Sequence, residues 1–133
     1  MARLIENLGY AVNDLAGIIT EISTAYANVL GYRPCDIVGR NFREFIAPEI
    51  SVRADQCFMH VIELGARDFR AVYALPDGDR LAMHISLMPV RTEKGVLVSV
   101  LIIPQAGSLV PQFKRGSVHS VRGREDLLGA VKP

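Results

Sequence analysis

Three strand-like segments follow one another in the second half of the chain, and this feature most restricts the possible fold. Residues 69–75 are followed by the turn sequence Pro-Asp-Gly-Asp at 76–79, which favours a tight hairpin. Residues 80–90 form a second segment, and a turn at 91–95 leads to an almost wholly apolar segment at 96–103. Such an apolar run is typical of a central strand that is covered on both faces. The sequence therefore predicts three consecutive antiparallel strands.

The first half of the chain predicts a hairpin followed by helices. Residues 9–14 are typical of a strand that runs into a turn, Gly17 provides the permissive backbone of that turn, and residues 18–22 alternate as a second strand. Ser23 is a suitable N-cap for a first helix, and the longest helix is expected at about 50–64. The apolar residues of this helix repeat at helical spacing: Ala54, Cys57, Phe58, Val61 and Ile62. Two strands, several helices and three strands form an α+β pattern.

Composition narrows the class of protein. The 133 residues are 50% hydrophobic and 22% charged with a net charge of +1, as expected for one folded domain without a preference for nucleic acid. Cys35 and Cys57 form neither a CxxC pair nor a metal-ligand spacing, which favours a reduced compartment. We find neither an export signal nor an apolar run of the ~18 residues that a membrane span needs. We therefore expect a cytoplasmic protein without direct contact to membrane or nucleic acid.

The chain divides into three parts. Residues 1–7 are a short lead-in, residues 8–104 form the domain, and residues 105–133 form a mildly basic extension or linker. We expect this tail to be flexible, with a short helical piece around 124–128. In the alternative, its apolar residues dock on the exposed face of the sheet in the same or the partner subunit: Leu109, Val110, Phe113, Leu127 and Leu128.

Several short stretches between residues 8 and 103 together resemble a PAS domain, the sensory and interaction module of signalling proteins. The matching stretches are residues 10–21, Leu30-Gly31-Tyr32, residues 37–42, Pro48-Glu49, Asp77-Gly78, and Pro89-Val90-Arg91 with Gly95. Ser23 is a departure, because the family often has Asn there. The resemblance implies a five-stranded antiparallel sheet with short helices and one longer helix on one face.

The resemblance also implies that a flavin or haem cofactor is possible, but the residues at two positions of this chain argue against both. Light-sensing relatives bind flavin through the Cys of an Asn-Cys-Arg-Phe-Leu-Gln motif, which corresponds here to residues 41–46. Phe42 stands in place of that Cys and Ile46 in place of the Gln, and a phenyl ring cannot form a thioether. The axial His of oxygen-sensing haem relatives corresponds to Ala54, and His60 should face away from the core side of the helix. We expect neither flavin nor haem nor a bound metal.

We expect the domain to be a regulatory sensor that binds a small molecule in its core. Such a ligand would shift a conformational or dimerisation equilibrium and so signal to a partner or an attached effector, as in phosphorelay or transcription regulation. The candidate pocket residues are Ala54, Phe58, Val61, Ile62, Phe42, Tyr73 and Ile85. The alternative is a ligand-free module for protein–protein interaction or dimerisation, with its core filled by side chains. No phosphate loop, zinc pattern or nucleophile elbow indicates an enzyme.

The strand predicted at 80–90 also offers a face for a partner. Leu81, Met83, Ile85 and Leu87 form its apolar side. The other side is more polar and should face solvent or a partner; it consists of Ala82, His84, Ser86 and Met88. We expect a homodimer through this face or through the lead-in, and we expect the methionines to pack rather than to bind a metal.

Overall fold

The computed structural model describes residues 8–105 and 110–112. Two short strands come first, β1 (Ala11–Asn13) and β2 (Ile19–Ile22). The helices follow as α1 (Thr24–Val29), α2 (Pro34–Ile37), η1 (Phe42–Glu44), η2 (Pro48–Ile50) and α3 (Ser51–Leu64). The last strands are β3 (Arg67–Ala74), β4 (Arg80–Arg91), β5 (Leu97–Pro104) and β6 (Val110–Gln112). The predicted α+β order and the long helix are confirmed.

The strands form one antiparallel sheet in the order β2-β1-β5-β4-β3. The first strand therefore lies beside the last long one, and β5 is central, so the predicted five-stranded sheet is confirmed. The short β6 pairs with the start of β4, with Val110 opposite Ala82. This part of the tail adds to a strand of the sheet. The helix expected around 124–128 and the other docking residues of the tail lie outside the described residues.

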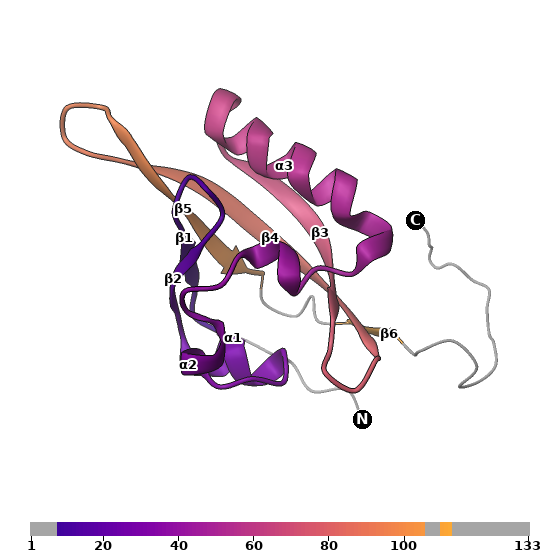
Figure 1. Ribbon diagram of the computed structural model, residues 1–133. Coiled ribbons are helices and arrows are strands. Elements are labelled where there is room, and N and C mark those ends of the chain that lie inside the picture. The colour runs from indigo at the N-terminus through magenta and orange to yellow at the C-terminus, as the bar shows by residue number, and fades with distance from the viewer. Residues whose placement is uncertain (1–7, 106–109, 113–133) are drawn as a thin grey trace.

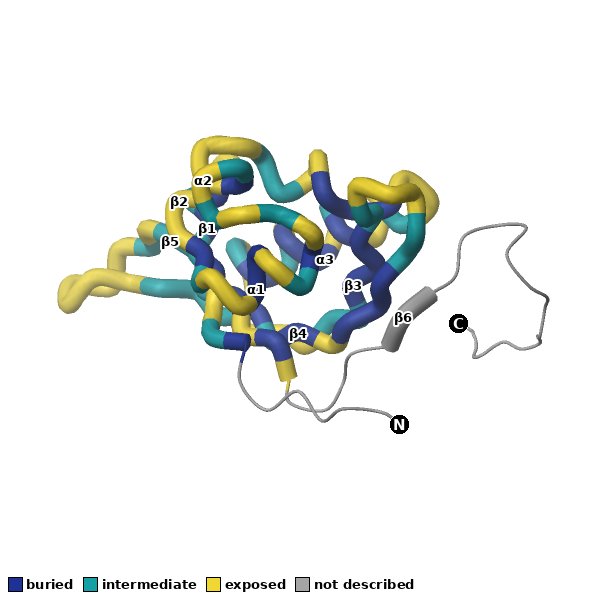
Figure 2. The backbone as a smooth tube through the Cα atoms, turned by 90° about the horizontal axis from the view of Figure 1, so that it is seen from below, coloured by how far each residue is buried: buried dark blue, intermediate teal, exposed yellow. Residues whose placement is uncertain are grey.

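The helices cover one face of the sheet (Figure 1). Helix α3 contacts β3, β4 and β5, and it turns Ala54, Cys57, Phe58 and Val61 into the core. Figure 2 shows buried backbone gathered between α1, α3 and the sheet, whereas the exposed hairpin between β4 and β5 projects away from it. The core therefore lies between the helical layer and the inner face of the sheet.

Ser23 occupies the N-cap position of α1, but its side chain makes no capping hydrogen bond. Its hydroxyl instead accepts from the Tyr10 backbone N–H at 3.3 Å and donates to the Leu8 carbonyl. The residue that was expected to cap the helix thus connects the start of α1 to the chain that enters β1.

The β1–β2 turn is packed against η1. Gly17 has a φ of +92°, and a Cβ at this position would lie 2.6 Å from Arg43 Nη1, so a larger residue would be strained and crowded. The Asp14 carboxylate accepts from the backbone N–H groups of Ala16 and Ile18, both at 2.9 Å. Asn41 Nδ2 donates to the Ala16 carbonyl at 3.2 Å. The turn is thereby fixed beside the helices that line the core.

The outer face of the sheet differs from the prediction in two places. Strand β5 is not covered on both faces, because Leu101 is only half-buried and Ile103 keeps 36% of its surface exposed. Ala82, expected on the solvent or partner face, is only 1% exposed. It packs with Ala47 and Val72, because the segment before η2 runs alongside β3, where the Ala47 N–H donates to the Val72 carbonyl at 2.8 Å. An alternating pattern within one strand cannot reveal such a neighbour.

The rest of the predicted partner face is more accessible. His84 is exposed, and Ser86 and Met88 are half-buried. Ser86 Oγ donates to Asp68 Oδ1 at 2.8 Å and accepts from Gln105 Nε2 at 3.1 Å. This face therefore mixes a polar network with apolar side chains.

Candidate functional site

A cavity lies between the helices and the inner face of the sheet. The cavity has a volume of about 60 Å³. Because one water needs at least about 10–15 Å³ by this measure, the cavity has room for about four waters. All the sheet strands from β1 to β5 and the helices α1, α2, η1 and α3 contribute to its wall. The aromatic part of the lining consists of Tyr26, Phe42, Phe45, Phe58, Phe69 and Tyr73.

The structure brings most of the candidate pocket residues together at this cavity. Its lining includes Ala54, Phe58, Phe42, Tyr73 and Ile85. Val61 and Ile62 are not among the lining residues: Val61 is fully buried within the core, and Ile62 packs against the core from a half-buried position. They lie about one turn beyond Phe58 on α3. That these residues bind a ligand stays a prediction.

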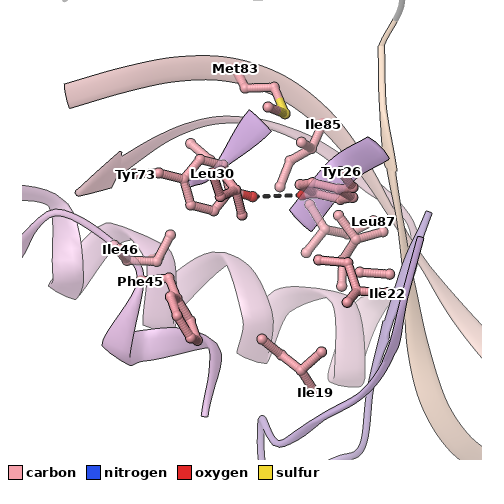
Figure 3. Packing of buried hydrophobic residues seen from close by; sticks show 14 of the residues in the cluster. Ile19, Ile22, Tyr26, Leu30, Phe45, Ile46, Tyr73, Met83, Ile85 and Leu87 are labelled. Carbon is pink, nitrogen blue, oxygen red and sulfur yellow. Dashed lines mark hydrogen bonds between the residues drawn. The ribbon is translucent and has the colours of Figure 1, made fainter. Parts of the chain in front are cut away.

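Two tyrosines from distant parts of the chain meet at the cavity. Tyr26 of α1 and Tyr73 of β3 share a hydrogen bond of 2.7 Å between their hydroxyls, and their rings meet edge to face (Figure 3). Burial raises the pKa of Tyr73 to about 12 and raises the pKa of Tyr26 well above its ordinary value. Both side chains therefore stay neutral at physiological pH. Sequence analysis missed Tyr26, because nothing local shows that its hydroxyl meets a residue 47 positions away.

Asn13 is another lining residue that sequence analysis missed. It is only 4% exposed, and it is the one buried polar or charged residue in the described part of the chain. Its Oδ1 has no hydrogen-bond partner there. The alternation of β1 could have placed Asn13 on the same inner face as Ala11. The adjacent turn at 14–17 suggested instead that the strand was already ending.

Phe42 and Phe58 form a wall of the cavity where η1 meets α3. Their ring centroids are 4.9 Å apart, and the Arg43 guanidinium lies 4.6 Å from the Phe42 centroid. Arg43 Nε also donates to Asp55 Oδ1 at 2.5 Å, so an ion pair links η1 to α3 beside this wall. At the position where the resemblance places a flavin-reactive Cys, this chain thus has a phenyl ring that packs against a second ring, with one guanidinium close to both.

Among the residues that the structure describes, no charged side chain lines the cavity. Its one thiol, Cys57, is buried, and burial raises its pKa, so it is a neutral thiol. His60 is half-buried and not part of the lining. In residues 8–105 and 110–112 no cluster of His, Cys, Asp or Glu is suited to hold a metal ion. The arrangement is chemically suited to enclose a small uncharged molecule.

The described helices also include none with the length and apolar content to cross a membrane. His84 lies on the exposed outer side of β4, away from the cavity.

Solved PAS domains share this fold. The PAS domain of an HTR-like protein from Haloarcula marismortui is 22% identical, with a TM-score of 0.61 over 73% of this chain and 78% of that one. The PAS-B domain of Drosophila melanogaster Cycle, with bound ethylene glycol, is 12% identical, with a TM-score of 0.65 over 73% and 97%. The dimer of Vibrio cholerae VqmA, described among LuxR-type receptors, is 23% identical, with a TM-score of 0.62 over 73% and 44%. VqmA also has a structure bound to DPO.

A comparison with curated proteins found no match. The sequence model of the PAS domain matches residues 7–104, which include the whole five-stranded sheet, the helices and the cavity between them. PAS domains are generally sensory modules without catalytic activity. On this match and on the shared fold, the chain belongs to the PAS domain family.

Proposed function

We propose that this domain is a sensor that binds a small molecule in its core cavity and passes the change to a partner or an attached effector. The cavity carries the proposal. Protein cores are packed as densely as organic crystals, and empty space in them costs stability. An apolar cavity in the middle of a well-formed core is therefore a reason to expect a ligand. Two structural neighbours, Cycle PAS-B and VqmA, have been solved with small molecules bound.

The strands offer a route from the cavity to the outer face. Leu87 of β4 and Ile102 of β5 line the cavity. Their chain neighbours Met88 and Leu101 lie opposite each other on the other face. Since consecutive residues of a strand point to opposite faces, a ligand that shifts these strands also moves the outer side chains. A ligand that binds one arrangement better changes the population of both.

A homodimer is a second proposed function, and the outer face favours it. Val12 lies opposite Leu101, and Leu101 lies opposite Met88, so three half-buried apolar side chains form a row across β1, β5 and β4. A row of this kind suits contact with another protein surface. We propose that a second copy binds here and that the ligand acts by changing this contact. If no ligand exists, dimerisation through this row would itself be the function.

We propose that the ligand is neither flavin nor haem and that the protein acts in the cytoplasm. The cavity wall has Phe42 and Ala54 where flavin and haem relatives have their reactive or axial residues, and neither side chain can bond to those groups. Purified protein should therefore be colourless. An absorption band of flavin or haem that persists through gel filtration would contradict this.

A thermal-shift screen with two matched variants tests ligand binding. Ala54→Leu fills part of the cavity from α3, whereas Ala25→Leu adds the same atoms at an exposed position of α1. Compounds that bind the core should raise the melting temperature of the wild type and of Ala25→Leu but not that of Ala54→Leu. Native mass spectrometry would show any co-purified ligand as added mass. If no compound separates the two variants and no added mass appears, the sensor proposal is wrong and the interaction module remains.

A further inference from the structure

We infer that the ligand of the core cavity is uncharged and carries an N–H or O–H group that donates a hydrogen bond to Asn13 Oδ1. This inference rests on the proposed function, since it requires that the cavity binds a ligand. It adds the chemical class of that ligand and the atom that recognises it.

The first support is the unsatisfied acceptor. Asn13 is 4% exposed and lines the cavity, and its Oδ1 is the one buried side-chain polar atom of the described residues without a partner. Buried polar groups in native proteins nearly always have a hydrogen-bond partner, because an unpaired one keeps the full cost of its lost hydration. An unpaired acceptor that faces a cavity is therefore a position for a donor from outside the chain.

The second support comes from the other polar groups of the lining. The hydroxyls of Tyr26 and Tyr73 bond to each other, so both oxygens have a partner, although only one of the two O–H groups donates in this bond. The Cys57 thiol is a weak donor and remains protonated. Among the lining side chains, Asn13 Oδ1 is thus the buried acceptor without any partner, and a ligand with a donor can pair with it where a purely apolar ligand cannot.

The third support is the absence of charge in the lining. No lining residue is charged, and the two tyrosines keep their protons at physiological pH. A carboxylate or ammonium that entered this site would lose its hydration without gaining a counter-ion. With room for about four waters, the cavity suits a molecule of about five non-hydrogen atoms, the size of one small ring.

Two pairs of probes separate these requirements. Pyrrole and furan have nearly the same shape and size, but only pyrrole carries an N–H donor. Propionamide and propionate have nearly the same shape, but only propionate is charged at pH 7. Dissociation constants are measured by NMR titration on the full chain for the wild type, Asn13→Leu and the control Asn28→Leu, which makes the same change at an exposed position of α1.

The wild type should bind pyrrole about tenfold more tightly than furan, and propionamide more tightly than propionate. Asn13→Leu should lose the preference for pyrrole while it still binds furan, and Asn28→Leu should keep it. Asn13→Leu should also melt at a higher temperature than the wild type in the absence of ligand, because it removes an unpaired acceptor from the core.

The outcomes distinguish this inference from the proposed function. If pyrrole and furan bind the wild type equally, or if Asn13→Leu keeps the preference, the cavity still binds small molecules but Asn13 does not select them. If Asn13→Leu melts at a lower temperature, Asn13 has a structural partner and the inference is wrong. If none of the probes binds and the thermal-shift screen also finds no ligand, the inference and the sensor proposal both fail.

Discussion

The two faces of β4 and β5 are both apolar where the two strands pair at Leu87, Met88, Val100 and Leu101, but they differ in role. Leu87 and Met88 are neighbours in β4, and Val100 and Leu101 are neighbours in β5. Leu87 and Val100 lie under the helices and are buried, whereas Met88 and Leu101 are half-buried on the outer face. The inner face surrounds a cavity, and the outer face presents an apolar row. At these four positions, hydrophobicity alone does not show which face of the sheet is buried. The position of the helices determines which face is covered.

The largest expected effect separates the two faces directly. Leu87→Ala removes buried apolar contacts and enlarges a cavity, so it should lower the free energy of unfolding by about 2–5 kcal/mol. Met88→Ala, one residue further along β4, should cost less than about 1 kcal/mol, because its side chain keeps contact with solvent. Urea denaturation of the two variants measures the difference. Equal losses would mean that the outer face is as well packed as the inner one.

Alkaline pH should weaken the inner face through its tyrosine pair. The folded pKa of Tyr73 is about 12, above the ordinary value of 10.0, so the folded state holds its proton more tightly than the unfolded state. This contribution is fully present below pH 10 and is lost as the pH rises towards 12. A shift of this size corresponds to a loss of about 3 kcal/mol. Unfolding measured at several pH values should show it, and Tyr73→Phe should make the pH dependence shallower; an unchanged slope would exclude Tyr73 as its source.

A charge on the outer face should weaken self-association. Met88→Lys places an ammonium in the apolar row, whereas Glu93→Lys introduces the same group in the exposed hairpin between β4 and β5. We expect the dimer dissociation constant to rise at least about tenfold for Met88→Lys and to change much less for Glu93→Lys. Sedimentation velocity over a concentration series measures both. A wild type that stays monomeric at high micromolar concentration would contradict the dimer itself.

The smallest effect is expected at the exposed ion pair beside the cavity wall. Asp55→Asn removes the charge that pairs with Arg43, whose side chain also donates to Asn41 and lies over Phe42. Because both partners are well exposed, the loss should be about 0.2–1 kcal/mol and should shrink further in high salt. Urea denaturation at low and high salt checks this. A loss as large as that of Leu87→Ala would mean that the pair fixes the position of η1 against α3.

Much of the fold could be predicted because its signals are local. The helical spacing from Ala54 to Phe58, the Asp77-Gly78 turn and the alternation of β4 depend on residues close in sequence. Five of the predicted pocket residues line the cavity, because the helices and the strands of a PAS fold enclose the core between them. The prediction failed for Ala82, whose burial depends on Ala47 from a distant segment.

The sequence by itself determined the order of strands and helices, the positions of the turns and the membership in the PAS family. The order of the elements and the turns follow from backbone preferences and short-range periodicity, which are present in any few consecutive residues. The family membership follows from the set of short stretches between residues 8 and 103 that resemble PAS domains. Only the tertiary structure decided that Tyr26 meets Tyr73, that Asn13 turns an unpaired acceptor into the core and that a cavity remains there. These features depend on how side chains from remote segments fill a common space. No local sequence pattern predicts these contacts, because the shape of the cavity depends on all the segments that line it.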